Sequence, residues 1–217
     1  MTHGEKFIED LKRHQLMVAI RTATAEDAYQ AAVACVEGGI RFVEITFSVP
    51  GAADVIRRLS RDARVVVGAG TVLSVDDAKT ALAAGASYIV SPHLDEAVVK
   101  FTKKEGMISI PGASTPTEIY RAHKAGGDII KLFPFVELGG LAFLKAVRGP
   151  LPFVRYMLCG GANLDNVSAY LAADAAGILI GTAIIRREHV AAKDWKGITG
   201  EAGKFVQKVA EASRSKG

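Results

Sequence analysis

Short apolar runs alternate with longer amphipathic stretches along most of the chain. The apolar runs are rich in Val and Ile, and most of them lack an alternation of apolar and polar residues. This pattern is typical of strands that are buried on both faces of a parallel sheet. It predicts strands at residues 16–20, 41–45, 64–67, 88–90, 107–110, 129–132, 154–158 and 177–180.

Between these runs, apolar residues recur at three- and four-residue spacing, which is typical of helices with one buried face. Several of these stretches begin after a capping residue, such as Thr24, Ser74 or Thr115, and several end at a glycine. The pattern predicts helices at residues 25–37, 52–60, 75–84, 95–104, 116–124, 141–147, 164–173 and 199–213.

Strands that are each followed by a helix favour a closed (β/α)₈ barrel of the TIM type. An open doubly wound sheet is the alternative, but it usually carries a Gly-x-Gly-x-x-Gly fingerprint after its first strand, and none follows residues 16–20. A length of 217 residues suits one core better than two. We therefore expect one α/β barrel domain over residues 1–217, with an extra N-terminal helix at residues 5–14 that closes its bottom.

The charges favour a small anionic ligand over a large partner. The net charge is +4, and the Lys and Arg residues are scattered along the chain, so we expect neither nucleic-acid nor membrane binding. The N-terminal segment lacks an apolar stretch suited to a signal peptide, and no apolar run reaches membrane-spanning length, so we expect a cytoplasmic protein. Two distant cysteines do not form a disulfide framework, and the five histidines form no obvious metal cluster.

Two charged residues stand inside predicted buried strands. Lys131 lies between Ile130 and Leu132, and Glu44 lies between Val43 and Ile45. A buried lysine tends to lose its proton, and a neutral amine can attack a carbonyl carbon, while a nearby carboxyl group can relay protons. The pair is equally compatible with a structural ion pair in the barrel mouth.

Glycines follow the last two predicted strands, at Gly160, Gly161 and Gly181, with Thr182 next in sequence. Free backbone N–H groups at this end of a barrel, next to a helix start, commonly hold phosphate. The simpler interpretation is that these residues form tight turns. Because two such turns follow neighbouring strands, we favour a phosphate site.

At these residues the chain resembles the class I 2-keto-3-deoxy-6-phosphogluconate (KDPG) aldolases, also described as 4-hydroxy-2-oxoglutarate aldolases. The resemblance runs from about Val18 to the end of the last predicted helix, and its motifs occur in the family's order. The matching segments are residues 38–46, 67–72, 89–92, 110–112, 114–118, 131–134 and 160–161.

The resemblance implies a homotrimeric aldolase without metal or cofactor, which acts on a keto acid or sugar-acid phosphate. Lys131 matches the family's Schiff-base lysine, and Glu44 matches its general acid/base. The remaining matches bind substrate: Thr71, Pro92 and Phe133 at the pyruvate end, and Gly160, Gly161, Gly181 and Thr182 at the phosphate end.

The chain departs from the family pattern at two positions. Ser48 stands where many members carry an Arg that binds the pyruvate carboxylate, and Cys159 stands where a Thr often precedes the glycine pair. We expect Arg21, at the end of the first strand, to supply the missing charge.

Two other hypotheses stay open: another phosphate-binding barrel enzyme, such as an epimerase or synthase, and a non-catalytic ligand-binding or assembly barrel.

Overall fold

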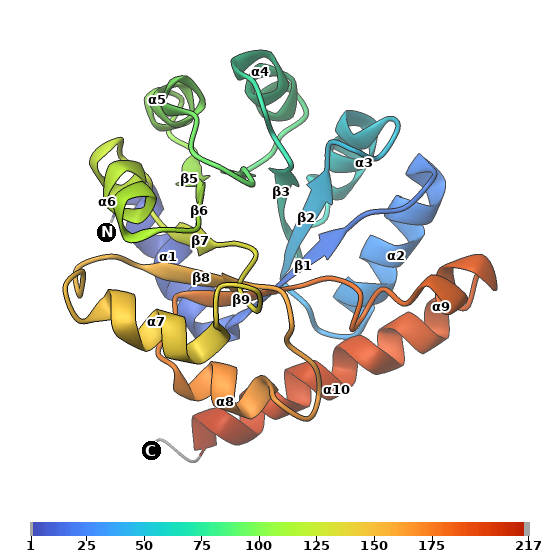
Figure 1. Ribbon diagram of the computed structural model, residues 1–217. Coiled ribbons are helices and arrows are strands. Elements are labelled where there is room, and N and C mark those ends of the chain that lie inside the picture. The colour runs from blue at the N-terminus through green and yellow to red at the C-terminus, as the bar shows by residue number, and fades with distance from the viewer. Residues whose placement is uncertain (1, 215–217) are drawn as a thin grey trace.

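The computed structural model describes residues 2–214 and has parallel strands at its centre with helices outside them (Figure 1). The strands are β1 (Leu16–Ile20), β2 (Phe42–Thr46), β3 (Val66–Gly70), β4 (Tyr88–Val90), β5 (Ile108–Ile110), β6 (Gly112–Ala113), β7 (Ile130–Leu132), β8 (Tyr156–Cys159) and β9 (Gly177–Ile180). The helices are α1 (His3–His14), α2 (Ala25–Glu37), α3 (Ala52–Leu59), α4 (Val75–Ala83), α5 (Glu96–Lys104), α6 (Pro116–Lys124), α7 (Gly140–Arg148), α8 (Val167–Ala172), α9 (Arg187–Ala191) and α10 (Trp195–Arg214).

The sheet closes into a barrel through a broken fifth strand. The strand order is β5-β4-β3-β2-β1-β9-β8-β7-β6, and only Pro111 separates the two ends, β5 and β6, in sequence. Proline has no N–H to donate, so the ladder is interrupted there. β5 pairs with β4, β6 pairs with β7, and the Gly112 N–H donates back to the His93 carbonyl at 3.3 Å. The predicted (β/α)₈ barrel is therefore confirmed, with its fifth strand in two pieces.

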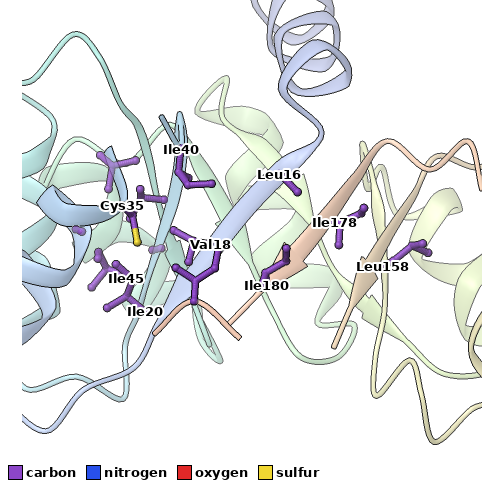
Figure 2. Packing of buried hydrophobic residues seen from close by; sticks show 14 of the residues in the cluster. Leu16, Val18, Ile20, Cys35, Ile40, Ile45, Leu158, Ile178 and Ile180 are labelled. Carbon is purple, nitrogen blue, oxygen red and sulfur yellow. The ribbon is translucent and has the colours of Figure 1, made fainter. Parts of the chain in front are cut away.

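Side chains on each strand alternate between two separate apolar clusters. Val18 and Ile45 belong to the outer cluster, which packs the strands against the helices and is shown in part in Figure 2. Met17 and Phe42 belong to the inner cluster, which fills the lower part of the barrel. Successive residues of a strand point to opposite faces, so one strand supplies both clusters. This explains why the strands lack an apolar–polar alternation in the sequence.

Helix α1 closes the bottom of the barrel, as the sequence predicts. It begins at a capping box: the Glu5 backbone N–H donates to the Thr2 hydroxyl, and the Thr2 backbone N–H donates to the Glu5 carboxylate. Phe7 packs against the rings of Phe42 and Tyr88, with centroids 5.2 and 5.4 Å apart. The lower interior is therefore sealed by apolar side chains.

The third strand lies later in the chain than predicted, at Val66–Gly70 in place of residues 64–67. Glycine ordinarily weakens a strand, so the predicted strand ended before Gly68. The structure keeps Gly68, Ala69 and Gly70 in the strand because all three pair with β2, and Ala69 also pairs with Ile89 of β4.

The chain after β8 also differs from the prediction. Helix α8 begins at Val167, later than residue 164, because the side chains of Asn163 and Asn166 hydrogen-bond to nearby backbone N–H groups and hold a turn before it. Helix α9 was not predicted. Trp195, which lies before the predicted helix at residues 199–213, begins α10 and packs against the outer cluster.

Candidate active site

A cavity of about 500 Å³ opens at the carboxyl ends of the strands. In a barrel of this kind the strand ends converge there, so residues far apart in the sequence share one space. Every predicted site residue lines this cavity: Arg21, Glu44, Thr71, Pro92, Lys131, Phe133, Gly160, Gly161, Gly181 and Thr182.

Glu44 lies on β2, two residues after Phe42, and so points into the barrel above the apolar inner cluster. Its side chain is only 2% exposed. The carboxyl group packs over Gly70 of β3, where an added Cβ would lie 1.7 Å from Oε1. Burial raises the pKa of Glu44, and the positive charges of Lys131 and Arg21 act in the opposite direction. The carboxyl group is therefore poised to hold or release a proton.

Lys131 lies at the centre of β7 and is 7% exposed. Its ammonium group lies 4.9 Å from the centre of the Phe133 ring and beside the Cys159 thiol. Burial raises the pKa of Cys159 to about 11, so that thiol is protonated at neutral pH. Within residues 2–214, no carboxylate lies in ion-pair contact with Lys131. The structural ion pair that the sequence left open is thus not formed in the structure.

Arg21 follows β1 and reaches across the cavity mouth to Thr71, where its guanidinium donates to Oγ1 at 3.2 Å. Thr71 has a φ of 55°, a left-handed conformation that non-glycine residues seldom adopt. Ser48 is exposed, its hydroxyl lies 2.9 Å from that of Thr46, and it does not line the cavity. Arg21 therefore contributes positive charge at the mouth, where Ser48 contributes none.

The glycines after β8 and β9 form the other end of the cavity. Gly160 and Gly161 have φ angles of 103° and 76°, and an added Cβ on Gly161 would lie 2.1 Å from the Val136 side chain. In the part of the chain that the structure describes, the N–H groups of Gly161 and Thr182 have no hydrogen-bond acceptor. Such free N–H groups suit an anion. They lie in loops, since α8 begins only at Val167.

Sequence reasoning missed several lining residues, among them Ala19, Thr46 and Leu179. Thr46 lies two residues after Glu44 on β2, and Ala19 lies on β1 two residues before Arg21, so each lies on the same face as a predicted site residue. The Thr46 hydroxyl donates to the Ile20 carbonyl at 3.0 Å and so ties the ends of β1 and β2 together. The two-residue periodicity of side chains along a strand would have been enough to predict both positions.

No three His, Cys, Asp or Glu side chains within residues 2–214 gather in a group that could hold a metal ion. No helix in the same part of the chain is long and apolar enough to cross a bilayer.

Known proteins resemble this chain over nearly its whole length. The sequence pattern of the KDPG and KHG aldolases matches residues 7–200. The 2-dehydro-3-deoxy-phosphogluconate aldolase of Treponema pallidum is 36% identical over 200 residues, which cover 92% of this chain and 95% of that protein. The KHG/KDPG aldolase of Escherichia coli is 33% identical over 183 residues, with 84% and 86% of the two chains covered.

A solved structure agrees with these sequence matches. The KDPG aldolase of Legionella pneumophila, which holds pyruvate as a covalent carbinolamine intermediate, superimposes with a TM-score of 0.81. It is 28% identical to this chain, and the match covers 89% of this chain and 94% of that one. From these matches and the barrel that carries them, we conclude that the chain belongs to the KDPG and KHG aldolase family.

Proposed function

We propose that this protein is a Schiff-base aldolase that cleaves 2-dehydro-3-deoxy-6-phosphogluconate to pyruvate and glyceraldehyde 3-phosphate. The observation that carries the proposal is the placement of Lys131 and Glu44 in one cavity, both buried and without an ion pair between them. A lysine held this way can act as a nucleophile, and a carboxyl group of raised pKa can act as both acid and base.

The first half of the reaction forms the imine. The neutral Lys131 amine attacks the C2 carbonyl carbon of the substrate and gives a carbinolamine. Glu44, in its protonated form, gives its proton to the departing hydroxyl group, which leaves as water. The product is a protonated imine between Lys131 and C2, and Glu44 is now a carboxylate.

The second half breaks the carbon–carbon bond. The Glu44 carboxylate takes the proton of the C4 hydroxyl group, the electron pair of the C3–C4 bond moves into the imine, and C4 leaves as the aldehyde of glyceraldehyde 3-phosphate. The enamine left on Lys131 takes a proton from Glu44 at C3. Water then hydrolyses the imine and releases pyruvate and the free amine, and the proton set free in this step returns to Glu44.

The two ends of the cavity would hold the two ends of this substrate. At the pyruvate end, Arg21 is the cation available to the carboxylate, with Thr71, Pro92 and Phe133 around it. At the other end, the free N–H groups of Gly161 and Thr182 suit the phosphate.

The second substrate in the family's description, 4-hydroxy-2-oxoglutarate, fits the same chemistry. It would be cleaved to pyruvate and glyoxylate without using the phosphate end. We extend the proposal to this smaller keto acid. The homotrimer that the resemblance implies, the absence of a metal or cofactor requirement and the cytoplasmic location stay predictions.

Trapping with borohydride tests the proposal. Pyruvate and sodium borohydride together should add a reduced three-carbon adduct to one lysine, and peptide mass mapping should place it at Lys131. Lys131→Ala should remove the adduct and all but about one part in 10⁴ of the turnover. The exposed Lys145 provides the control, since Lys145→Ala should keep both.

The same experiment separates the alternatives. An epimerase or synthase of this fold would turn over a phosphorylated substrate without an adduct on Lys131, and a non-catalytic barrel would do neither. Either result, or an adduct on another lysine, would overturn the proposal.

A further inference from the structure

The hydroxyl group of Tyr88 is a buried polar group that the proposed reaction does not use. Tyr88 begins β4 and points into the barrel, where its ring packs against Phe7 and its side chain is 0% exposed. Within the described residues its hydroxyl oxygen has no hydrogen-bond partner. A buried hydroxyl without a partner costs free energy, so its presence in an otherwise apolar layer calls for a reason.

Glu44 has the complementary atom. Its Oε2 is also fully buried without a hydrogen-bond partner, and in the described chain only these two side-chain atoms share that condition. A phenol can donate one hydrogen bond, and an ionised carboxylate can only accept. The two unpartnered atoms are therefore a matched donor and acceptor.

Strand β3 brings the two groups side by side. The ring atoms Cδ2, Cε2 and Cζ of Tyr88 lie over Gly68, at 2.3–2.5 Å from the place where a Cβ would stand. The Glu44 carboxyl lies over Gly70 in the same way. Gly68 and Gly70 are two residues apart and face the same side, so their positions differ by about 7 Å. Cζ carries the hydroxyl, and the charge of Glu44 acts on the phenol, so the two groups lie near each other inside the barrel.

We propose that Tyr88 is a positioning residue for Glu44, and that its hydroxyl donates a hydrogen bond toward the Glu44 carboxylate through one bridging water or after a small rotation of either side chain. Two glycines on β3 make this arrangement possible, because a Cβ at either position would overlap one of the two side chains. The proposal rests on the proposed function only for its effect on catalysis, since the hydrogen bond itself can be measured without substrate.

The groups that face Glu44 come from several elements. Lys131 on β7 and Arg21 after β1 are cations, while Cys159 on β8 is a protonated thiol. Burial raises the pKa of Tyr88 well above its ordinary range, and the charge of Glu44 raises it further. The phenol is therefore a neutral donor throughout the working pH range, and it differs from the two cations in that substrate binding and imine formation leave it unchanged.

A donated hydrogen bond stabilises the charged form of Glu44, so its loss should raise the pKa of that carboxyl group. The test is a ¹³C NMR titration of chains labelled at the glutamate carboxyl carbon, with the Glu44 signal assigned by its disappearance in Glu44→Gln. Tyr88→Phe should raise the measured pKa of Glu44 by about one unit. The acid limb of the kcat/KM profile should move to higher pH by the same amount.

Tyr156→Phe is the matched control. Tyr156 is also buried on a barrel strand, but its hydroxyl donates to the Leu151 carbonyl at 3.0 Å, away from Glu44. This variant should leave the Glu44 pKa unchanged. If Tyr88→Phe also leaves that pKa unchanged, the hydrogen bond does not exist and the inference is wrong, whatever the aldolase assay shows.

A second measurement covers the case in which Tyr88→Phe fails to fold. Incorporation of 3-fluorotyrosine into the otherwise unchanged chain makes the phenol a stronger donor, so the pKa of Glu44 should fall. An unchanged value would again overturn the inference. Failure of borohydride trapping at Lys131 would instead overturn the proposed function and leave the NMR result intact.

Discussion

The floor and the rim of the cavity are built from different parts of the polypeptide. The floor, which consists of Glu44, Lys131 and Cys159, is made of side chains that point into the barrel from its strands. The rim, which consists of residues 160–161 and 181–182, is made of loop backbone that follows β8 and β9. Burial on the floor can change the pKa of a side chain. The rim offers backbone N–H groups, which do not titrate.

The sequence positions of these parts reflect the same difference. On the floor, the residue two positions before each functional residue belongs to the apolar inner cluster, as Phe42 does before Glu44 and Ile129 before Lys131. This apolar layer withdraws water from the charged groups, and burial raises the pKa of Glu44. On the rim, positive φ angles at Gly160 and Gly161 turn the backbone into a shape that other residues seldom adopt. Changes to the floor should therefore affect chemistry, and changes to the rim should affect binding.

The largest effect in this comparison should come from Glu44→Gln, which removes the proton relay and keeps the shape of the floor. We expect turnover to fall by about 10²–10⁴-fold, the usual scale of general acid–base catalysis. Borohydride trapping of pyruvate should persist at a lower rate, because Lys131 is intact. Steady-state kinetics and a timed trapping assay measure the two effects. Near-normal turnover would show that Glu44 is only structural.

The same variant should be more stable than the wild type at neutral pH. Burial raises the pKa of Glu44 in the folded chain, so between its ordinary value of 4.5 and the raised value the folded chain binds more protons than the unfolded one. The contribution of Glu44 to stability is therefore fully present below pH 4.5 and is lost as the pH rises through the folded pKa. Glutamine does not titrate, so the gain in Tm should appear at neutral pH and vanish in acid.

The barrel could be predicted because its apolar runs are separated by helices with strong caps, such as those at Thr24 and Ser74. The floor could be predicted because a charge inside an apolar run is conspicuous, as at Lys131. The predicted third strand ended before Gly68 and Gly70, because glycine is uncommon in strands. Only the structure shows why the strand contains them: the side chains of Tyr88 and Glu44 pack over these two positions. No role was predicted for Tyr88, because a tyrosine in an apolar strand is usually part of the hydrophobic core.

A smaller effect should come from Arg21, which stands between the floor and the solvent at the cavity mouth. Arg21→Ala should raise the KM for the keto acid more than about tenfold, the scale of one charge-assisted hydrogen bond, with a smaller change in kcat. The Thr71 hydroxyl, which Arg21 now contacts, should not replace it, because it carries no charge.

Ser48→Arg in the Arg21→Ala background is the matched rescue. Ser48 is exposed near the cavity mouth and has room for a longer side chain, so part of the lost affinity for the keto acid should return. Initial-rate measurements over a range of substrate concentrations decide the point. If Arg21→Ala keeps KM within about twofold of the wild-type value, another group binds the carboxylate, and the backbone N–H group of Thr71, which follows β3, becomes the candidate.

The smallest effect should come from the rim, where Gly160→Ala and Gly161→Ala form a matched pair. Both glycines have positive φ, so an alanine at either position should cost about 1–2 kcal/mol of stability. The two differ in their surroundings: no atom lies within 4 Å of an added Cβ on Gly160, whereas the one on Gly161 would overlap Val136. Gly161→Ala must therefore shift its loop, and with it an N–H group proposed to bind phosphate.

The kinetic signature of that shift should depend on the substrate. For Gly161→Ala we expect KM for the phosphorylated substrate to rise about three- to tenfold, the scale of one weakened hydrogen bond, while kcat/KM for 4-hydroxy-2-oxoglutarate changes by less than about twofold. Gly160→Ala, with a similar loss of Tm, should change both substrates less. An equal loss for both substrates in Gly161→Ala would show that the rim also shapes the floor, and the division of the cavity into a chemical floor and a binding rim would then be wrong.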